Sequence, residues 1–347
     1  MSEPPDPVVT RALDAVARRR DLSAEEAGEV LERIMSGEVS PPQIAGFLIA
    51  LRTKGETVEE VVGFARTMRS LATPVHVARA GELLDTAGTG GGRTSFNVST
   101  TAALIAAGSG CPVAKHGNRS ATSLSGSADL LEALGARIDL APEAVGRCIE
   151  EAGFGFMFAP AHHQATRFVV PVRKALGVRT IFNLLGPLTN PAGAGCQLIG
   201  VSDPAFTEVV AGALRALGAA RALIVSSDDG LDELSAAAPT QVIEVDGEGI
   251  RRYTVTPAEV GVEPVAGDAA PGGTPAENAA TTRAILDGRP GPARAVALMN
   301  AGAAIYAAGQ AETIADGVEL ARRAIDDGSA RAALERFVAA TNELAPS

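Results

Sequence analysis

The sequence predicts an α/β protein in two parts, a small N-terminal helical domain and a larger α/β domain with a mainly parallel central sheet. Up to about residue 73, apolar residues recur only at helical spacing. Beyond Pro74, short apolar or β-branched runs alternate with alanine- and leucine-rich helical runs, the pattern of a parallel sheet covered by helices. Glycine- or hydroxyl-rich stretches follow several of the short runs, as expected where strands end in ligand-binding loops. We therefore expect domains at residues 1–73 and 74–347.

Helix-capping signals support the N-terminal domain. Three helix starts are predicted, two by a capping box and one by a cap followed by proline: Ser23 with Glu26, Thr57 with Glu60, and Ser40 before Pro41. Apolar residues then recur at helical spacing, as in Leu31, Ile34 and Met35. These signals predict a purely α-helical module.

The larger domain is expected to contain six short strands followed by a hairpin. The predicted strands are 83–85, 112–115, 137–140, 154–158, 197–201 and 221–226, and the hairpin joins 240–245 to 251–255. Residues 261–275, rich in Gly, Pro and Ala, are expected to form a loop. From residue 276 onward the pattern is helix after helix, punctuated by glycines.

The net charge and the cysteine content make several classes of function unfavourable. The net charge of −11 disfavours broad nucleic-acid binding, because phosphates would be repelled over most of the surface. An anionic substrate would therefore need a local cationic patch or a metal. The three cysteines form no Cys-X-X-Cys pair, and no window reaches the roughly 18 uncharged apolar residues of a membrane helix. We expect buried thiols, no membrane partner and a cytoplasmic location.

The stretch at residues 85–100 holds the first candidate binding loop. Gly88, Gly90, Gly91 and Gly92 lie between a predicted strand and the helix-forming run 101–107. Glycine lets the main chain approach a ligand closely, and a helix start offers unpaired N–H groups, so this stretch can cradle a phosphate. Taken alone, a flexible surface loop explains the glycines equally well.

A second candidate loop begins with Lys115-His116-Gly117-Asn118-Arg119, at the end of another predicted strand. Three potentially cationic side chains beside a hydroxyl-rich stretch would form an anion cradle in this acidic protein. A solvated turn with a capping serine is the alternative.

The third candidate is the acidic run Asp228-Asp229-Gly230-Leu231-Asp232-Glu233, which follows a further predicted strand. Hard oxygen ligands suit Mg²⁺, and the spacing does not match an EF-hand. A magnesium ion bridging a phosphate is one interpretation, and a solvated acidic turn is the other.

Two further features have open interpretations. Arg173, in an otherwise apolar setting, could pair with a substrate carboxylate, although a surface salt bridge is the default for a lone arginine. His162 and His163 are adjacent and should point in different directions, which disfavours a zinc site.

Taken in order, these stretches resemble the anthranilate phosphoribosyltransferase family. The resemblance covers nearly the whole chain and is carried by Gly88-Thr89-Gly90-Gly91, Asn97-Val98-Ser99-Thr100, Lys115-His116-Gly117-Asn118-Arg119, Gly126-Ser127-Ala128-Asp129, Pro171-Val172-Arg173, residues 182–191 and Asp232-Glu233. It implies a fold like that of the nucleoside phosphorylases and phosphoribosyltransferases. It also implies transfer of the phosphoribosyl group of phosphoribosyl diphosphate to the amine of anthranilate, in tryptophan biosynthesis.

The resemblance further implies roles for individual residues. Phosphoribosyl diphosphate would be bound by Gly88, Thr89, Gly90, Gly91, Ser95, Asn97, Ser99, Thr100, Lys115, Asn118, Arg119, Ser123 and Ser127. Anthranilate would be bound by Gly88, His116, Asn118, His163 and Arg173. Two Mg²⁺ ions would use Ser99, Asp232 and Glu233, and the catalytic residues would be Lys115, Asp232 and Glu233. A homodimer through the helical domain is implied, and so is a contribution of residues 165–185 to that domain.

One departure from the family lies in the glycine-rich stretch. The family usually reads Gly-Thr-Gly-Gly-Asp-Gly here, whereas this chain has Gly92-Arg93 after Gly91 and is one residue shorter. The resemblance and this departure together predict that Arg93 adds positive charge beside the phosphates.

Two other functions remain as alternatives. A pyrimidine nucleoside phosphorylase-like enzyme is disfavoured because its own loop motifs are not found here. A non-catalytic paralogue that binds a nucleotide or nucleic acid is disfavoured by the negative net charge of the chain and by the retained Asp232-Glu233 pair.

Overall fold

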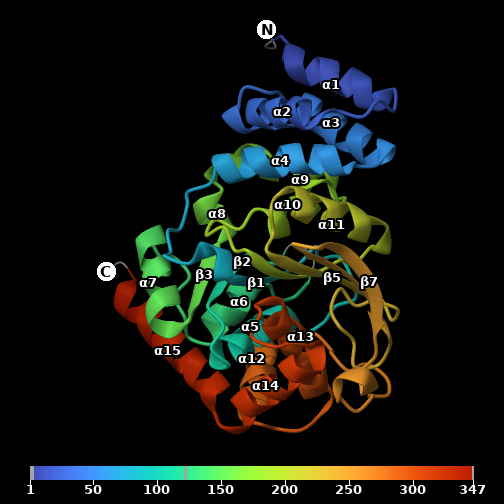
Figure 1. Ribbon diagram of the computed structural model, residues 1–347. Helices are drawn as coiled ribbons and strands as arrows, with labels where there is room; N and C mark the ends of the chain where they lie inside the picture. Colours follow the sequence, from blue (N-terminus) through green and yellow to red (C-terminus); the bar gives the residue numbers. More distant parts are fainter. Residues whose placement is uncertain (1–3, 121–122, 346–347) are drawn as a thin grey trace.

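The computed structural model describes residues 4–120 and 123–345. Figure 1 shows a helical domain at one end of the molecule and a larger α/β domain at the other. The helical domain is built from α1 (Pro7–Ala17), α2 (Ala24–Ser36), α3 (Pro41–Lys54) and α4 (Val58–Ser70). The predicted fold class is confirmed.

The predicted helix starts are confirmed, with one difference in capping. Ser23 and Thr57 both form complete capping boxes, each with the glutamate three residues later. α3 does begin at Pro41, but the Ser40 hydroxyl makes no capping bond and lies 3.3 Å from Gln43 Oε1 instead. Proline in the first turn therefore marks this helix start without a side-chain cap.

A seven-stranded sheet forms the centre of the larger domain, in the order β3-β2-β1-β4-β5-β6-β7. The first five strands in sequence are parallel, and β6 and β7 form the predicted antiparallel hairpin on β5. Their bounds are β1 (Leu84–Gly88), β2 (Val113–Gly117), β3 (Phe154–Phe158), β4 (Cys196–Gly200), β5 (Arg221–Ser227), β6 (Thr240–Asp246) and β7 (Gly249–Val255).

The strand predicted at 137–140 is wrong. These residues follow α6 without regular structure, and the N–H of Arg137 donates to the Thr341 hydroxyl rather than to a neighbouring strand. Ile138 and Leu140 are buried in two different apolar clusters. The alternating burial therefore comes from packing against helices. Alternation with a period of two does not by itself distinguish such a segment from a strand.

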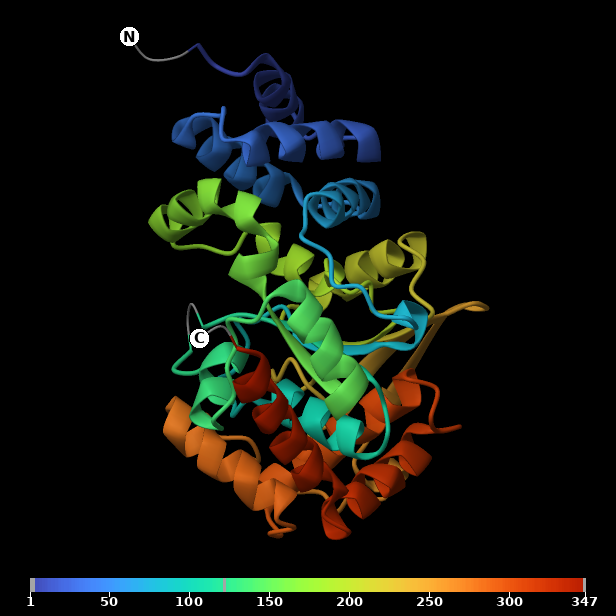
Figure 2. The ribbon, with the colours of Figure 1, turned by 90° about the vertical axis from the view of Figure 1, so that its left-hand side faces the viewer.

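Helices cover both faces of the sheet (Figures 1 and 2). In the larger domain they are α5 (Val98–Gly108), α6 (Ser127–Ala133), α7 (Pro142–Ala152), α8 (Ala159–His162), α9 (Val170–Leu176), α10 (Phe182–Leu188), α11 (Thr207–Ala216), α12 (Pro275–Leu286), α13 (Pro292–Ala307), α14 (Ile314–Asp326) and α15 (Ser329–Leu344). The short 3₁₀ turns are η1 (Ala80–Glu82), η2 (Gln164–Phe168), η3 (Pro204–Phe206) and η4 (Ala258–Val260). The stretch at 182–191, one of the motifs that carry the resemblance, is the helix α10 up to Leu188.

Alternate strand residues face two different cores. Leu198 and Leu223 belong to the apolar cluster that includes α5 and α12 to α15, whereas Ile199 and Ile224 belong to a cluster shared with the helical domain. η2 contacts α2 and α9 contacts α3, and Figure 2 shows this green segment against the blue helices. Residues distant in sequence thus complete the packing of the N-terminal helices.

Two remaining expectations concern cysteines and membranes. Cys111, Cys148 and Cys196 are buried free thiols, as predicted. Among the described residues, every helix is too short or too polar to cross a membrane.

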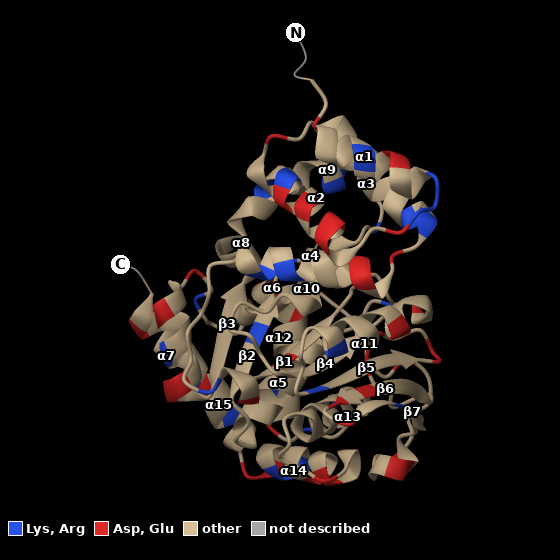
Figure 3. Cartoon of the chain, turned by 45° about the horizontal axis from the view of Figure 1, so that its top comes forward, with Lys and Arg blue, Asp and Glu red and all other residues tan. Residues whose placement is uncertain are grey.

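Figure 3 shows acidic and basic residues interspersed along helices such as α2 and α14.

Candidate active site

The candidate loops meet at the carboxyl ends of the parallel strands. β1 lies between β2 and β4, so the chain runs to one side of β1 through β2 and β3 and to the other through β4 and β5. Ligands of open α/β sheets bind at such a reversal of strand order. The ends of β1 and β4 are in register there, with Gly88 opposite Gly200.

The glycine loop, residues 88–92, follows β1 and packs closely against the acidic run. Gly90 and Gly91 have φ angles of 63° and 78°, which glycine adopts readily. A Cβ on Gly88 would lie 2.9 Å from Asp232 Oδ2, and one on Gly200 would overlap the backbone carbonyl of Asp232. Glycines at these positions allow the acidic run to lie directly on the strand ends.

Asp232 and Glu233 are the two carboxylates that face the glycine loop and α5. Burial raises the pKa of both, and the neighbouring charge of Asp232 raises the pKa of Glu233 further. Lys115 and a backbone hydrogen bond from Ser99 act in the opposite direction on Glu233. A half-buried and a buried carboxylate next to each other are costly to ionise together, because their like charges repel.

Asp228 and Asp229 are held elsewhere, so the predicted group of four carboxylates divides into two pairs. Asp228 accepts from Gln241 at 3.3 Å, and Asp229 Oδ2 accepts from the Ser235 hydroxyl at 2.7 Å.

Arg93 is also paired within the protein. Its guanidinium lies 2.5 Å from Asp268 Oδ1 and 3.6 Å from Asp229 Oδ2. The expectation that it adds free positive charge beside the phosphates is therefore wrong. The arginine instead ties the glycine-rich stretch to the acidic run and to the loop that precedes α12.

Lys115 is a buried cation beneath the glycine loop. Its ammonium donates to the carbonyl of Thr86, to the Thr86 hydroxyl at 3.2 Å and to the Ser99 hydroxyl at 3.3 Å. Burial lowers its pKa, and the carboxylates of Asp85 and Glu233 oppose that effect. The site therefore combines one buried lysine with the two carboxylates and the Ser99 hydroxyl.

Asn97 precedes α5 but does not cap it. Its side-chain amide donates to the carbonyl of Ser125 at 3.0 Å, and its Oδ1 accepts from the Ser125 hydroxyl and from Asn278 Nδ2. The first-turn N–H groups of α5 therefore receive no bond from this side chain. Asn278 is buried and holds Asn97, a role that sequence patterns did not indicate.

The hydroxyl-rich loop after β2 presents some predicted residues to solvent and engages others. Asn118 and Ser123 are exposed, and the Ser127 hydroxyl donates to the carbonyl of Asn118 at 3.2 Å. Arg119 instead turns to α6, where its guanidinium bonds Asp129 at 2.7 Å and Glu132 at 2.6 Å. Arg119 therefore brings little free positive charge to this loop.

Three further residues of the predicted set lie near the start of α5 and the glycine loop. Ser95, before α5, forms an isolated bridge with Pro271. Thr89 is buried, and its hydroxyl accepts from the N–H of Ser202 at 3.2 Å. The Thr100 hydroxyl is buried without a partner among the described residues.

His116 and His163 form a buried pair, with ring centroids 5.1 Å apart. His116 Nδ1 contacts the carbonyl of Gly186 at 3.1 Å, and His163 Nε2 contacts that of Thr189 at 3.1 Å. Burial lowers the pKa of His116 to about 3 and that of His163 to about 4. His162 points elsewhere, to the carbonyl of Thr73, so the two adjacent histidines diverge as predicted.

Arg173, on α9, is half-buried, and its guanidinium makes no ion pair or hydrogen bond with any described residue. Its guanidinium lies 5.3 Å from the centre of the Phe182 ring, and burial lowers its pKa. A guanidinium without a carboxylate partner is available for one.

Arg179 is a residue that the sequence analysis did not single out. It lies between α9 and α10, and its guanidinium donates to the carbonyls of Thr89 and Gly90 in the glycine loop. It is 89 residues from Gly90, and only the fold brings the two together.

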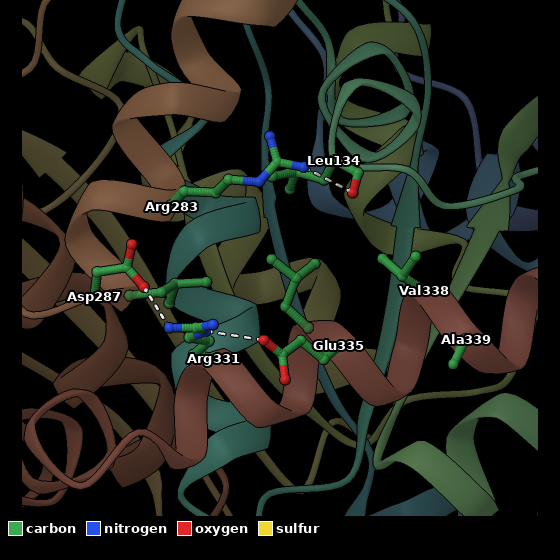
Figure 4. A pocket seen from close by; sticks show the side chains of 9 residues that line it. Leu134, Arg283, Asp287, Arg331, Glu335, Val338 and Ala339 are labelled. Carbon is green, nitrogen blue, oxygen red and sulfur yellow. Dashed lines mark hydrogen bonds and ion pairs between the residues drawn. The ribbon is translucent and has the colours of Figure 1, made fainter.

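A pocket between α12 and α15 lies outside this site (Figure 4). Its charged residues are already paired: Arg331 with Asp287 and Glu335, and Arg283 with the carbonyl of Leu134. None of the predicted site residues lines it.

Two family models match the chain. Residues 80–331 match the α/β domain of a glycosyl transferase family, and residues 10–72 match the helical bundle domain of the same name. Curated relatives include the anthranilate phosphoribosyltransferases of Symbiobacterium thermophilum and Moorella thermoacetica, each 51% identical. The alignments cover 96% and 94% of this chain and 97% and 96% of those proteins.

Solved structures agree with the sequence relatives. The anthranilate phosphoribosyltransferase from Thermus thermophilus has a TM-score of 0.90 and 49% identity, over 95% of this chain and 99% of that one. The Saccharomyces cerevisiae enzyme in complex with PRPP and Mg has a TM-score of 0.88 and 27% identity, over 97% and 98%. The same yeast enzyme in complex with 4-fluoroanthranilate has a TM-score of 0.85 and 25% identity, over 97% and 99%.

Proposed function

This chain belongs to the anthranilate phosphoribosyltransferase family, and we propose that the loops at the carboxyl ends of β1, β2, β4 and β5 form its active site. The protein is a glycosyltransferase that transfers the phosphoribosyl group of phosphoribosyl diphosphate to the amine of anthranilate, in tryptophan biosynthesis. The observation that carries the site assignment is the group formed by the buried Lys115 and Glu233 with the half-buried Asp232, which lies against the glycine loop.

The diphosphate end of the donor substrate binds to the glycine loop and the start of α5. The N–H groups of Val98 and Ser99 already bond the carbonyl of Phe96 and the carboxylate of Glu233, so α5 attracts the anion through the positive end of its dipole and the loop amides supply the hydrogen bonds. The exposed side chains of Asn118 and Ser123 then contact the ribose phosphate. The full proposed set is Gly88, Thr89, Gly90, Gly91, Ser95, Asn97, Ser99, Thr100, Lys115, Asn118, Arg119, Ser123 and Ser127.

Asp232, Glu233 and Ser99 would hold Mg²⁺, and we propose two ions. The donors fit: they are hard oxygens, and both carboxylates have their pKa raised by burial, so a cation would relieve them. Within residues 4–120 and 123–345, no cluster of three or more His, Cys, Asp or Glu side chains could hold a metal. Substrate phosphate oxygens would therefore complete the ligand set, as is usual for Mg²⁺.

Bound Mg²⁺ supplies neutralisation of charge on the departing diphosphate. Lys115 adds a fixed positive charge on the same side of the site and holds the Ser99 hydroxyl in place. Preorganised charges in a buried site stabilise a leaving anion more strongly than solvent does.

Anthranilate binds through its carboxylate to Arg173 and lies beside His116, with Gly88, Asn118 and His163 nearby. His116 donates from Nδ1 to the carbonyl of Gly186, which leaves Nε2 as an acceptor, and Nε2 is buried without a partner among the described residues. Its pKa of about 3 keeps the ring neutral near pH 7. It can therefore accept an N–H of the substrate amine and orient the nitrogen lone pair.

The reaction needs positioning rather than a strong base. The amine of anthranilate is neutral near pH 7, so its nitrogen can form a bond to the anomeric carbon as the bond from that carbon to the diphosphate oxygen breaks. The bonding electrons leave with diphosphate, and the surplus proton leaves the nitrogen afterwards.

We also propose a homodimer through the helical domain and a cytoplasmic location. Ile49 on α3, Val170 on α9 and Val178 just after α9 are large apolar side chains that are exposed, and α3 contacts α9. We call these three exposed side chains the apolar patch and propose that they lie in the dimer interface. The buried free thiols suit a reducing compartment.

The function is tested by incubating the protein with Mg²⁺, phosphoribosyl diphosphate and either anthranilate, nicotinate or uracil. We expect diphosphate release only in the reaction that contains anthranilate as the acceptor, together with loss of anthranilate fluorescence. Release with uracil, or phosphorolysis of uridine by inorganic phosphate, would favour a nucleoside phosphorylase-like activity. Binding without turnover would favour the non-catalytic alternative.

The metal assignment is tested by Asp232→Asn, with Asp228→Asn as the matched control in the same loop. Asp232→Asn should lower kcat by at least about 100-fold, with an unchanged circular dichroism spectrum, because it removes a charge from the proposed metal ligands. Asp228→Asn should stay close to wild type, since Asp228 bonds Gln241 away from the glycine loop. Full activity in Asp232→Asn would exclude the metal role.

A further inference from the structure

Arg179 reaches the glycine loop from a different part of the fold. Its Nη1 donates to the carbonyl of Gly90 and, at 3.0 Å, to the Ser202 hydroxyl, and its Nη2 donates to the carbonyl of Thr89 at 3.2 Å. A side chain on Gly91 would overlap this guanidinium. One planar group therefore bonds two successive carbonyls of the loop.

These bonds determine which way the loop amides point. In a trans peptide unit the C=O and the N–H of the next residue point in opposite directions. Since the carbonyls of Thr89 and Gly90 face Arg179, the N–H groups of Gly90 and Gly91 face away from it. Asp232 lies against the same loop, with Oδ1 3.1 Å from the position of a Cβ on Gly92. The N–H of Gly90 donates to the carboxylate of Asp232, so this amide already points to the carboxylate side of the site, and the N–H of Gly91 is the next donor along the loop.

The arginine is itself held from two sides. Arg52, near the end of α3, donates from Nη1 to the backbone carbonyl of Arg179 at 2.7 Å. Ser202, just after β4, donates from its hydroxyl to the carbonyl of Gly90 at 2.8 Å and so supports the same peptide unit. The helical domain thereby holds the backbone of Arg179, and Ser202 accepts from its guanidinium.

We propose that Arg179 is a positioning residue that orients the amides of the glycine loop towards the diphosphate of the donor substrate. This inference rests on the proposed function of the loop. Arg179 acts through the peptide units and does not itself contact the diphosphate. Without it, Gly90 and Gly91 can rotate, because glycine has wide backbone freedom.

The test is equilibrium binding of inorganic diphosphate with Mg²⁺, measured by calorimetry, together with steady-state kinetics. Arg179→Ala should weaken diphosphate binding by at least about 10-fold and raise the KM for phosphoribosyl diphosphate similarly, because it removes charge-assisted hydrogen bonds. The KM for anthranilate should change less than about 2-fold at saturating donor substrate. Arg179→Lys should recover only part of the affinity, since an ammonium lacks the planar fork that spans two carbonyls.

Arg167→Ala is the matched control, because Arg167 is an exposed arginine of the same segment whose guanidinium lies 4.7 Å from the centre of the Phe168 ring. It should bind diphosphate as wild type does. If Arg179→Ala fails to fold, Ser202→Ala and Arg179→Lys carry the test, and both should weaken binding. Wild-type affinity in a folded Arg179 variant would overturn the inference. Failure of the wild-type protein to bind diphosphate at all would instead overturn the proposed function of the loop.

Discussion

Arg173 differs from most charged residues of this protein, because no described residue pairs with its half-buried guanidinium. Arg119 and Arg93, which also lie near the site, are each bonded to two carboxylates. A guanidinium kept free of internal partners can form a two-bond fork with a substrate carboxylate. Its free state therefore distinguishes Arg173 from the other arginines near the site.

Arg173→Ala should raise the KM for anthranilate by at least about 10-fold, the scale of a lost charge-assisted contact. The KM for phosphoribosyl diphosphate should change less than about 2-fold. Lys174→Ala is the matched control, since Lys174 is the exposed neighbour on α9. Steady-state kinetics with each substrate varied would measure both values, and equal effects on the two KM values would contradict the assignment.

At the scale of elements, α10 organises the acceptor side of the site. The last carbonyls of a helix have no intrahelical partner. Here the carbonyl of Gly186 contacts His116, that of Pro187 accepts from Gln197 Nε2 at 2.8 Å, and that of Thr189, just past the helix, contacts His163. The end of this short helix therefore sets the orientation of both histidines.

The end of β4 is constrained by its close approach to the acidic run. A Cβ on Gly200 would overlap the carbonyl of Asp232, which is backbone and cannot rotate away. Gly200→Ala should lower the free energy of unfolding by roughly 1–3 kcal/mol, as overpacking does, and should also reduce Mg²⁺-dependent turnover.

Gly247→Ala is the control for this substitution, because nothing lies within 4 Å of its Cβ position and its φ is not in the left-handed region. Denaturant unfolding and the transferase assay would be measured on both variants. Equal behaviour of the two would show that the acidic run can shift away from β4 without cost.

At the scale of the whole molecule, the helical domain and the α/β domain share one apolar cluster. Residues of α1 to α4, η2, α9 and one face of β4 to β6 contribute to it. The bond from Arg52 to the Arg179 backbone adds a direct link between α3 and the segment that holds the glycine loop. Assembly through the helical domain would therefore take place on a scaffold continuous with the site.

Ile49→Asp should convert the proposed homodimer to a monomer, because it places a charge in the apolar patch of α3 and α9. The expected readout is a halved mass in light scattering, with the circular dichroism spectrum retained. Leu71→Asp is the control, since Leu71 is 42% exposed at the end of α4, outside this patch. A wild-type monomer, or an unchanged mass in Ile49→Asp, would contradict assembly through this surface.

The sequence by itself determined the local structure and the identity of the loops. Capping boxes, periodic apolar residues and glycine punctuation are local signals, so the helical domain, the hairpin and nearly all strands could be predicted. The one wrong strand, at 137–140, shows the limit: buried alternation there comes from helices packed on both sides. The order of the motifs along the chain likewise indicated the family before the structure was considered.

Only the tertiary structure decided which polar side chains are free and which are engaged. Arg93 and Arg119 lie in predicted binding stretches, yet both are neutralised by carboxylates from other elements. Arg179 was not predicted, because its partners in the glycine loop lie 89 and 90 residues away. Such pairings depend on how strands and helices are arranged in space, and a linear pattern carries no information on that arrangement.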